Sequence, residues 1–212
     1  MTTAARPGGR PRGRPRGFDR GAALARAMEV FWALGYEGAT MGELTTAMGI
    51  NSPSLYAAFG SKEELFREAV ALYDATEGTA VTRALSEEPT ARAAVATVLR
   101  ETARACTEPG RPTGCMIVVA ALNCSQANSP ARDFLSGWRR EGDEALTRRL
   151  EQGVRDGDVP AGTDTAAASA FLGAVLHGMS IRARDGATRA ELERTAETTL
   201  TAWDVLYGAE RP

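Results

Sequence analysis

The chain has 212 residues, 43% of them hydrophobic, and a formal net charge of −2. That length allows one sizeable core and a small satellite domain. With no apolar run of about 18 residues and no apolar N-terminal stretch, we expect a soluble, intracellular protein rather than a membrane or secreted one. The three cysteines (Cys106, Cys115, Cys124) form no CxxC pair, which fits a reducing compartment and argues against a disulfide framework.

Residues 1–17 are predicted to form a flexible basic arm. Five arginines precede Asp19 with no acidic residue between them, and glycine and proline separate them. The segment from Pro11 to Pro15 resembles the AT-hook, in which Gly13 lets the backbone approach the floor of the minor groove and the prolines keep the chain extended. The alternative is a solvated tail without a function. The arm arginines that we expect to contact DNA are Arg10, Arg12, Arg14 and Arg16.

Four helices are predicted after the arm. The first runs from about Asp19 to Leu34, where apolar residues recur at helical spacing and stop at Gly35. The second starts at the capping box Thr40 to Glu43 and ends at Gly49. The third starts at Asn51 or Ser52 and ends at Gly60. A second capping box, Ser61 to Glu64, opens a longer fourth helix.

Beyond Pro89 the periodicity predicts longer helices, and no alternating strand pattern occurs anywhere. The expected ranges are 90–107, 114–127, 131–153, 164–184 and 188–207. The sequence therefore predicts an all-α fold.

The second and third helices have the proportions of a helix-turn-helix. The run from Thr40 to Leu65, TMGELTTAMGINSPSLYAAFGSKEEL, resembles the DNA-binding signature of the TetR family of transcriptional repressors. The resemblance implies about nine helices, with a DNA-binding domain over 18–75 and a ligand-binding and dimerisation domain over 76–212. It also implies a homodimer that binds a pseudo-palindromic double-stranded operator and is released by an effector.

The candidate DNA contacts lie in the helix-turn-helix. Thr40 is expected to cap its helix and to meet a phosphate there. Short side chains in the first turn of the third helix would approach base edges. The resemblance implies phosphate contacts for Tyr56 and Lys62, although core packing of Tyr56 and a plain capping-box lysine stay open. The first-turn residues are Asn51, Ser52, Pro53 and Ser54, whereas Leu55 and Phe59 are predicted to be core.

Apolar faces on four later helices predict an effector cavity, with a plain core as the alternative. Cys115 is expected in the first turn of helix 114–127, where the helix dipole favours a thiolate, and Cys124 on that helix's opposite face. Modification of Cys115 would then trigger release, unless all three cysteines are merely small core residues. The candidate lining is Cys115, Met116, Val119, Phe134, Trp138, Phe171, Val175 and His177.

The last two predicted helices are the expected dimer surface. One carries a stripe of small residues, and the other carries larger apolar residues at helical spacing. The stripe consists of Ala167, Ala170, Ala174 and Gly178; the larger residues are Leu192, Ala196, Leu200, Trp203 and Leu206.

An enzyme is not expected. His177 is the only histidine, no Ser-His-Asp arrangement is available, and no cofactor motif or metal-binding pattern is present. The alternative function is an architectural minor-groove DNA-binding protein that senses no effector. Residues 68–212 hold sixteen basic and twenty-one acidic side chains, and this acidic region is far larger than an anchor needs.

Overall fold

The computed structural model describes residues 17–207, and every regular element in that range is a helix, without a strand. The arginines of the predicted arm, Arg10, Arg12, Arg14 and Arg16, lie outside it. The elements are α1 (Arg20–Gly38), α2 (Met41–Met48), α3 (Ser52–Phe59), α4 (Lys62–Tyr73), the π-helical segment η1 (Asp74–Gly78), α5 (Thr79–Glu87), α6 (Ala91–Ala105), α7 (Met116–Val119), the 3₁₀ turn η2 (Gln126–Asn128), α8 (Ser129–Asp156), α9 (Thr165–Arg184) and α10 (Arg189–Leu206).

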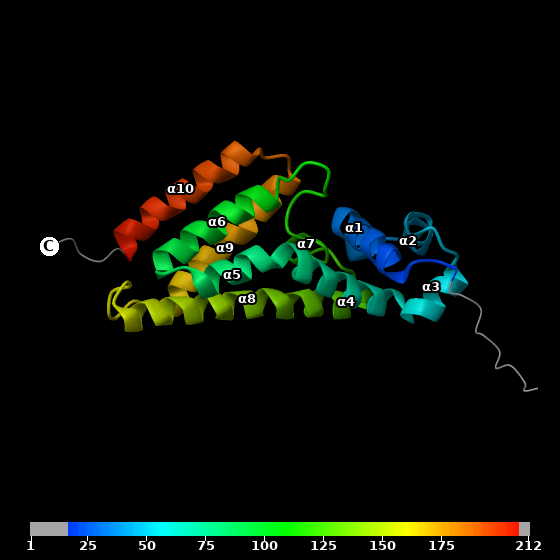
Figure 1. Ribbon diagram of the computed structural model, residues 1–212, viewed down its shortest axis with the longest axis horizontal. Helices are drawn as coiled ribbons and strands as arrows, with labels where there is room; N and C mark the ends of the chain where they lie inside the picture. Colours follow the sequence, from blue (N-terminus) through cyan, green and yellow to red (C-terminus); the bar gives the residue numbers. More distant parts are fainter. Residues whose placement is uncertain (1–16, 208–212) are drawn as a thin grey trace, which may run out of the picture.

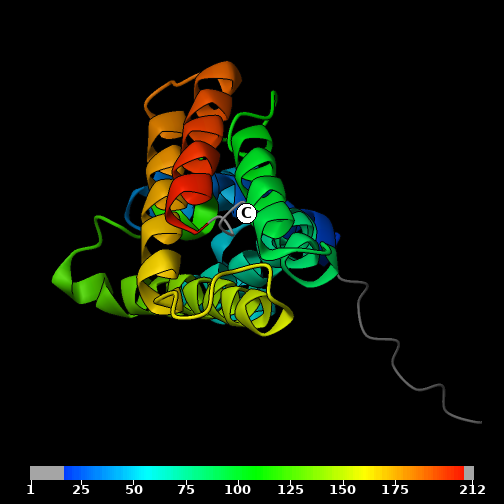
Figure 2. The same ribbon diagram turned by 90° about the vertical axis from the view of Figure 1, so that its left-hand side faces the viewer.

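The molecule is elongated, with two helical groups along its length (Figure 1). We call α1–α4 the head and α5–α10 the body. The chain passes from head to body through α4, η1 and α5, which follow one another without a break. Helix α8 runs beside them, and α6, α9 and α10 pack together at the other end (Figures 1 and 2).

Two apolar clusters hold these groups. The first joins the head to the start of α8, because Phe31, Leu55 and Phe66 share it with Leu135. The second fills the body between α6, α8, α9 and α10 and includes Leu150 and Trp203. Leu55 and Phe59 are buried, which confirms their predicted place in the core.

Side-chain caps fix the starts of the head helices. The Thr40 hydroxyl accepts from Glu43 N–H, and the Glu43 carboxylate accepts from Thr40 N–H, so the predicted capping box is present. Asn51 caps α3 by accepting from Ser54 N–H. Ser61 caps α4 by accepting from Glu64 N–H. These caps make the sequence a good guide to the start of each helix.

Helix α1 continues past its predicted end at Leu34. Gly35 adopts φ +74°, which kinks the helix, and the chain then completes a last turn to Gly38. The kink lets Tyr36 N–H donate to Ala120 O at 2.6 Å. A Cβ at Gly35 would lie 3.0 Å from Ala120 O, so glycine suits both the dihedral angle and the close approach.

The predicted helix 114–127 is wrong in extent. Helix α7 ends at Val119, and a turn with the 3₁₀ segment η2 leads to α8. The sequence Asn123 to Ser129 is rich in Ser and Asn, whose side chains compete for backbone hydrogen bonds. Helix α5 and segment η1 were not predicted at all, and α8 begins before its predicted start.

Helix α9 alone, among residues 17–207, is long and apolar enough to span a membrane. Part of its most apolar window, 39%, is buried inside the protein, and core helices of soluble proteins have the same composition. We therefore interpret α9 as a packed helix of the body.

Candidate nucleic-acid interface and body cavity

The start of α3 projects from the head. Gly49 ends α2 in the left-handed conformation with φ +68°, so the chain turns directly into the cap at Asn51. Burial of Leu55 and Phe59 anchors the opposite face of α3. Asn51, Ser52 and Pro53 are consequently exposed, and Ser54 is half-buried.

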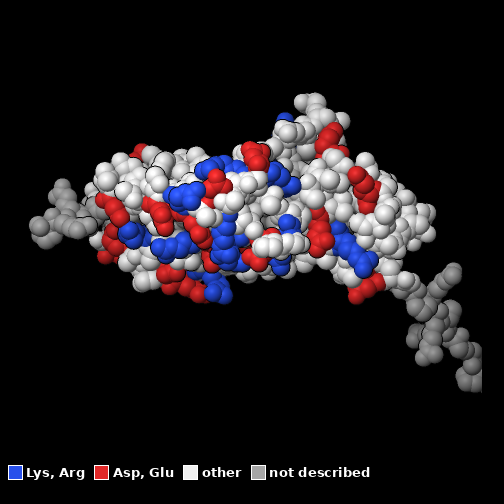
Figure 3. Space-filling model, turned by 90° about the horizontal axis from the view of Figure 1, so that it is seen from above, with Lys and Arg blue, Asp and Glu red and all other residues white. Residues whose placement is uncertain are grey.

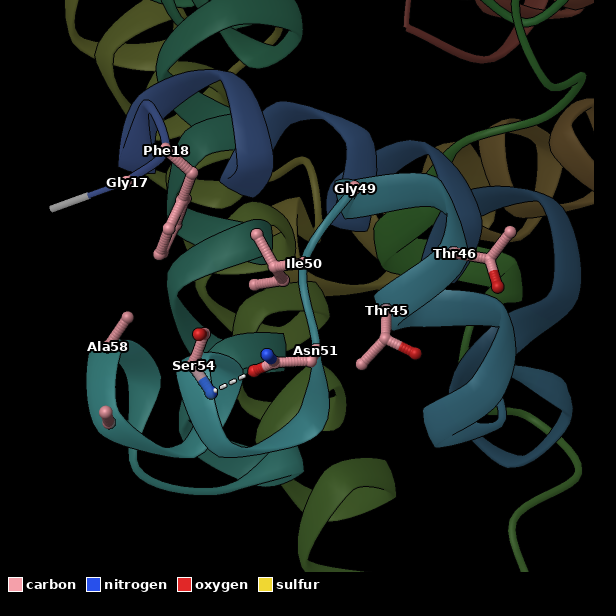
Figure 4. Close-up of a pocket in the computed structure, with 10 residues that line it drawn as sticks. Gly17, Phe18, Thr45, Thr46, Gly49, Ile50, Asn51, Ser54 and Ala58 are labelled. Carbon is pink, nitrogen blue, oxygen red and sulfur yellow. Dashed lines mark hydrogen bonds between the residues drawn. The ribbon is translucent and has the colours of Figure 1, made fainter.

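A shallow hollow of about 720 Å³ lies between α2, α3 and the start of α1. We call it the α2–α3 hollow. Figure 4 shows Phe18 and Ile50 on one side of it, with the hydrogen bond from Ser54 N–H to Asn51 Oδ1 nearby. Gly17, the first described residue, also lines it, so the predicted arm joins the molecule beside α3. Its lining is Gly17, Phe18, Thr45, Thr46, Gly49, Ile50, Asn51, Ser54, Ala57 and Ala58.

The three predicted phosphate contacts have different surroundings. Thr40 is exposed, and the hydrogen bonds from its backbone N–H and its hydroxyl lower the pKa of Glu43. Tyr56 is 50% exposed, which excludes the core-packing alternative. The Nζ of Lys62 lies 4.5 Å from the centre of the Tyr36 ring, and burial lowers the pKa of Lys62. Its ammonium therefore has a fixed position at the start of α4.

Arg20 is a positioning residue that the sequence did not reveal. Its Nε and Nη2 donate to Ala58 O at 3.3 and 3.2 Å, and Nη2 donates to the Glu68 carboxylate at 2.7 Å. The guanidinium also lies 4.3 Å from the centre of the Phe59 ring. These contacts tie α1 to α3 and α4. Because the partners are far away in the sequence, no local pattern could have indicated them.

The body contains a cavity of about 370 Å³ between η1, α5, α6, α7, α8 and α9. Its wall combines apolar side chains such as Leu85, Val98 and Leu146 with charged groups. Arg139 is one of these charged residues, and its Nη1 donates a hydrogen bond of 2.8 Å to Ile117 O, also in the wall. Burial lowers the pKa of His177, so its imidazole is neutral at neutral pH.

Of the eight predicted lining residues, the cavity brings together Cys115, Trp138 and His177. Met116 is fully buried and Phe134 half-buried in the cluster shared with the head. Val119 lines a different hollow beside Leu34 and Leu122. The other two also lie outside this wall: Phe171 is 38% exposed, and Val175 packs against the body core.

The cysteines occupy three different environments. Cys106 is buried, and burial raises the pKa of its thiol to about 12. Cys115 precedes the first residue of α7, lines the cavity, and lies beside the Tyr73 hydroxyl. Cys124 lies beyond the end of α7, near Glu37 and Lys62 of the head. The prediction that Cys124 shares a helix with Cys115 is therefore wrong, although the two thiols do lie apart.

The segment around α7 connects this cavity to the head. Gly114 O accepts a hydrogen bond of 2.7 Å from the indole N–H of Trp32 in α1. On the body side, Cys115 N–H donates to Ser180 Oγ at 2.7 Å. Arg184 of α9 adds hydrogen bonds of 2.9 and 2.6 Å to the carbonyl oxygens of Ala33 and Trp32. One face of this segment thus lines the cavity while the other holds α1.

Comparison with known proteins agrees with this architecture. Residues 23–69 match the family described as "Bacterial regulatory proteins, tetR family", and residues 89–199 match the "Tetracyclin repressor-like, C-terminal domain". The chain is 33% identical to the HTH-type transcriptional repressor ComR of Escherichia coli, over 87% of this chain and 89% of ComR. It is 30% identical to the repressor BdcR of the same organism, over 82% and 83% of the two chains.

A solved structure is also similar to this chain. A cysteine mutant of the TetR family transcriptional regulator CifR, complexed with a 26-base-pair operator DNA, is 46% identical to this chain. The match covers 90% of this chain and 100% of that one, with a TM-score of 0.87. These relatives are transcriptional regulators with the same two-part helical architecture. The chain therefore belongs to the TetR family of bacterial transcriptional regulators.

Proposed function

We propose that this protein is a ligand-responsive repressor that binds a pseudo-palindromic operator as a homodimer. The observation that carries the proposal is the connection from the exposed start of α3, through α1 and α7, to a cavity in the body. In this proposal residues 1–17 are a basic arm, 18–75 the DNA-binding domain and 76–212 the sensing and dimerising domain. Like its family, the protein would act inside the cell.

The proposed dimer surface is the outward face of α9. Ala167, Ala170, Ala174 and Ile181 are exposed at helical spacing, and small residues allow a second helix to approach closely. The larger residues expected on α10 do not belong to this surface. Leu192, Ala196, Leu200 and Trp203 pack inside the protomer's own core. Val205 and Leu206, which are 81% and 59% exposed, can still extend the surface at the end of α10.

Operator binding is tested by footprinting the promoter upstream of the protein's own gene and by selecting binding sites from random duplexes. The expected result is a two-fold-related site, because a two-fold dimer presents two copies of α3 to successive turns of the duplex. Selection of no sequence would contradict the proposal.

Effector release follows from the position of Cys115 in the cavity wall. We propose that modification of this thiol displaces the segment around α7 and so moves α1 and the head. Treatment with an electrophile or a peroxide should weaken operator binding of the wild type at least tenfold and leave Cys115→Ser unaffected. An equal response of both proteins, or none, would instead favour a reversible apolar ligand in the same cavity.

The architectural alternative lacks an effector. It has less support, because the body cavity is built from six elements and is connected to α1. If small molecules that stabilise the full chain against heat also weaken operator binding, the alternative is excluded. Their failure to affect operator binding would favour it.

A further inference from the structure

The folded head is acidic, which is unusual for a domain that binds DNA. Residues 17–75 carry eight acidic and four basic side chains, a net charge of −4. On the face seen in Figure 3, acidic side chains lie beside basic ones, and no large basic patch marks the head in that view. The acidic residues are Asp19, Glu29, Glu37, Glu43, Glu63, Glu64, Glu68 and Asp74; the basic ones are Arg20, Arg26, Lys62 and Arg67.

Three of these four cations already have partners within the head or at its border. Arg20 donates to Ala58 O and Glu68. Arg67 donates to Glu63 at 2.9 Å, and its guanidinium lies 4.5 Å from the centre of the Phe134 ring. Lys62 lies over the Tyr36 ring.

Arg26 differs from the other three. Its side chain is exposed on α1, and within residues 17–207 it makes no hydrogen bond and no ion pair, not even with Glu29 one turn along the helix. Its Nη1 would lie 3.5 Å from a Cβ placed on Gly49, so the guanidinium lies beside the turn between α2 and α3. Gly49 lines the α2–α3 hollow, so Arg26 lies next to one of the residues that form that hollow.

We propose that Arg26 binds a backbone phosphate of the operator at the turn between α2 and α3. A guanidinium matches the geometry of a phosphate, and one without an acceptor loses no existing partner when it binds. Gly17, where the arm joins, lines the same hollow. Arg26 then supplies positive charge beside the hollow, which the acidic head otherwise lacks. The inference rests on the proposed operator binding, to which it adds a contact.

The experiment measures operator affinity against salt concentration, on the site obtained by selection, with the full chain. Arg26→Ala should reduce the log–log salt slope by about 1.8, because the dimer loses one phosphate contact, worth about 0.9, in each of its two heads. Affinity should fall by a similar factor on every operator variant, because phosphate contacts carry no sequence information. Arg26→Lys keeps the charge and should keep most of the slope.

Arg100→Ala is the matched control. Arg100 is also an exposed arginine without a hydrogen-bond or ion-pair partner in the described part of the chain, but it lies on α6 in the body. Its removal changes the net charge equally and should leave the slope unchanged. Helical circular dichroism and the melting temperature check that each variant folds, and Arg26→Gln provides a second neutral variant.

The possible outcomes separate the two proposals. If the wild type binds its operator and both neutral Arg26 variants keep its salt slope, the Arg26 contact is excluded while operator binding stands. If Arg26→Ala alters the selected consensus, the residue reads bases and the phosphate assignment is wrong. If the wild type selects no operator, operator binding itself fails and the Arg26 contact fails with it.

Discussion

Short polar side chains at the start of α3 restrict how this protein can read a base pair. Ser52 and Ser54 can each donate or accept one hydrogen bond, and Pro53 offers only apolar contact. None of them has the bidentate geometry with which arginine selects guanine. We therefore expect modest discrimination at each base pair, with phosphate contacts supplying much of the affinity.

Substitutions at these positions should separate into two classes. Lys62→Ala and Tyr56→Phe should weaken binding to all operators alike, because their expected partners are phosphates. Ser52→Ala and Ser54→Ala should change which operator is preferred, by about 0.5–1.5 kcal/mol at the affected base pair, the range for one hydrogen bond. Binding selection over randomised sites for all four variants measures both effects. A consensus that shifts with Lys62→Ala would reverse its assignment.

Single residues also show where sequence reasoning ends. Thr40, Asn51 and Ser61 were predicted as caps because a cap and its partner are three residues apart. The surroundings of Arg20 and Arg26 could not be predicted in this way, since Ala58, Glu68 and Gly49 come near these two side chains only when the chain folds. The same limit explains why Cys115 and His177 line the cavity while Phe134, also predicted to line it, belongs to the cluster shared with the head.

At the scale of elements, local caps set the starts of α2, α3 and α4, and the end of α1 depends on a tertiary contact. Helix α1 extends past Gly35 because the last turn gains a hydrogen bond to Ala120 O. Helix α7 ends at Val119, and the stretch rich in Ser and Asn that follows it competes for backbone hydrogen bonds. Periodicity therefore stops the first helix at Gly35, where the structure has its kink, and misses only the last turn; it extends α7 too far.

The capping box of α2 should make head stability depend on pH. Hydrogen bonds from the Thr40 N–H and hydroxyl lower the pKa of Glu43 in the folded state. The stabilisation is therefore fully present above the ordinary pKa of 4.5 and is lost as the pH falls through the lowered value. Glu43→Gln should be less stable than the wild type at neutral pH, and the difference should shrink in acid.

Denaturant unfolding at several pH values measures that difference. Glutamine keeps an acceptor for both hydrogen bonds, so the comparison isolates the charge. Glu191→Gln tests the same arrangement at the start of α10, where the hydroxyl and N–H of Thr188 lower the pKa of Glu191. A difference that stays constant from neutral to acid pH would contradict the explanation.

In the proposed homodimer, operator binding depends on how the two protomers meet. An operator-bound dimer holds two heads at a fixed separation, and binding through both heads is far stronger than binding through one. The outward face of α9 is apolar and poorly covered within one protomer. Covering it with a second copy would remove Phe171 and Ile181 from water.

Ala174→Arg places a charged side chain in the middle of that face. We expect a folded monomer whose operator affinity falls at least a hundredfold, because the second head no longer adds to the first. Light scattering gives the mass and circular dichroism the helix content. Ala71→Arg, at an exposed position of α4, is the matched control and should remain dimeric. A dimeric Ala174→Arg protein would exclude this surface.

The unbroken path from α4 through η1 to α5 also fixes the rotational phase between head and body. A π-helical turn holds one residue more than an α-helical turn, since its hydrogen bonds close to the fifth residue rather than the fourth. Deleting one residue from Asp74–Gly78 would let the helix continue as regular α and would change the rotation of α5 relative to α4 little, because four α-helical residues turn the chain about as far as five π-helical ones. The π-helical segment thus absorbs one extra residue without changing how the head is turned relative to the body, whereas a further one-residue deletion, made in regular α-helix, would rotate α5 by about 100° and alter which operator geometry the proposed dimer can span.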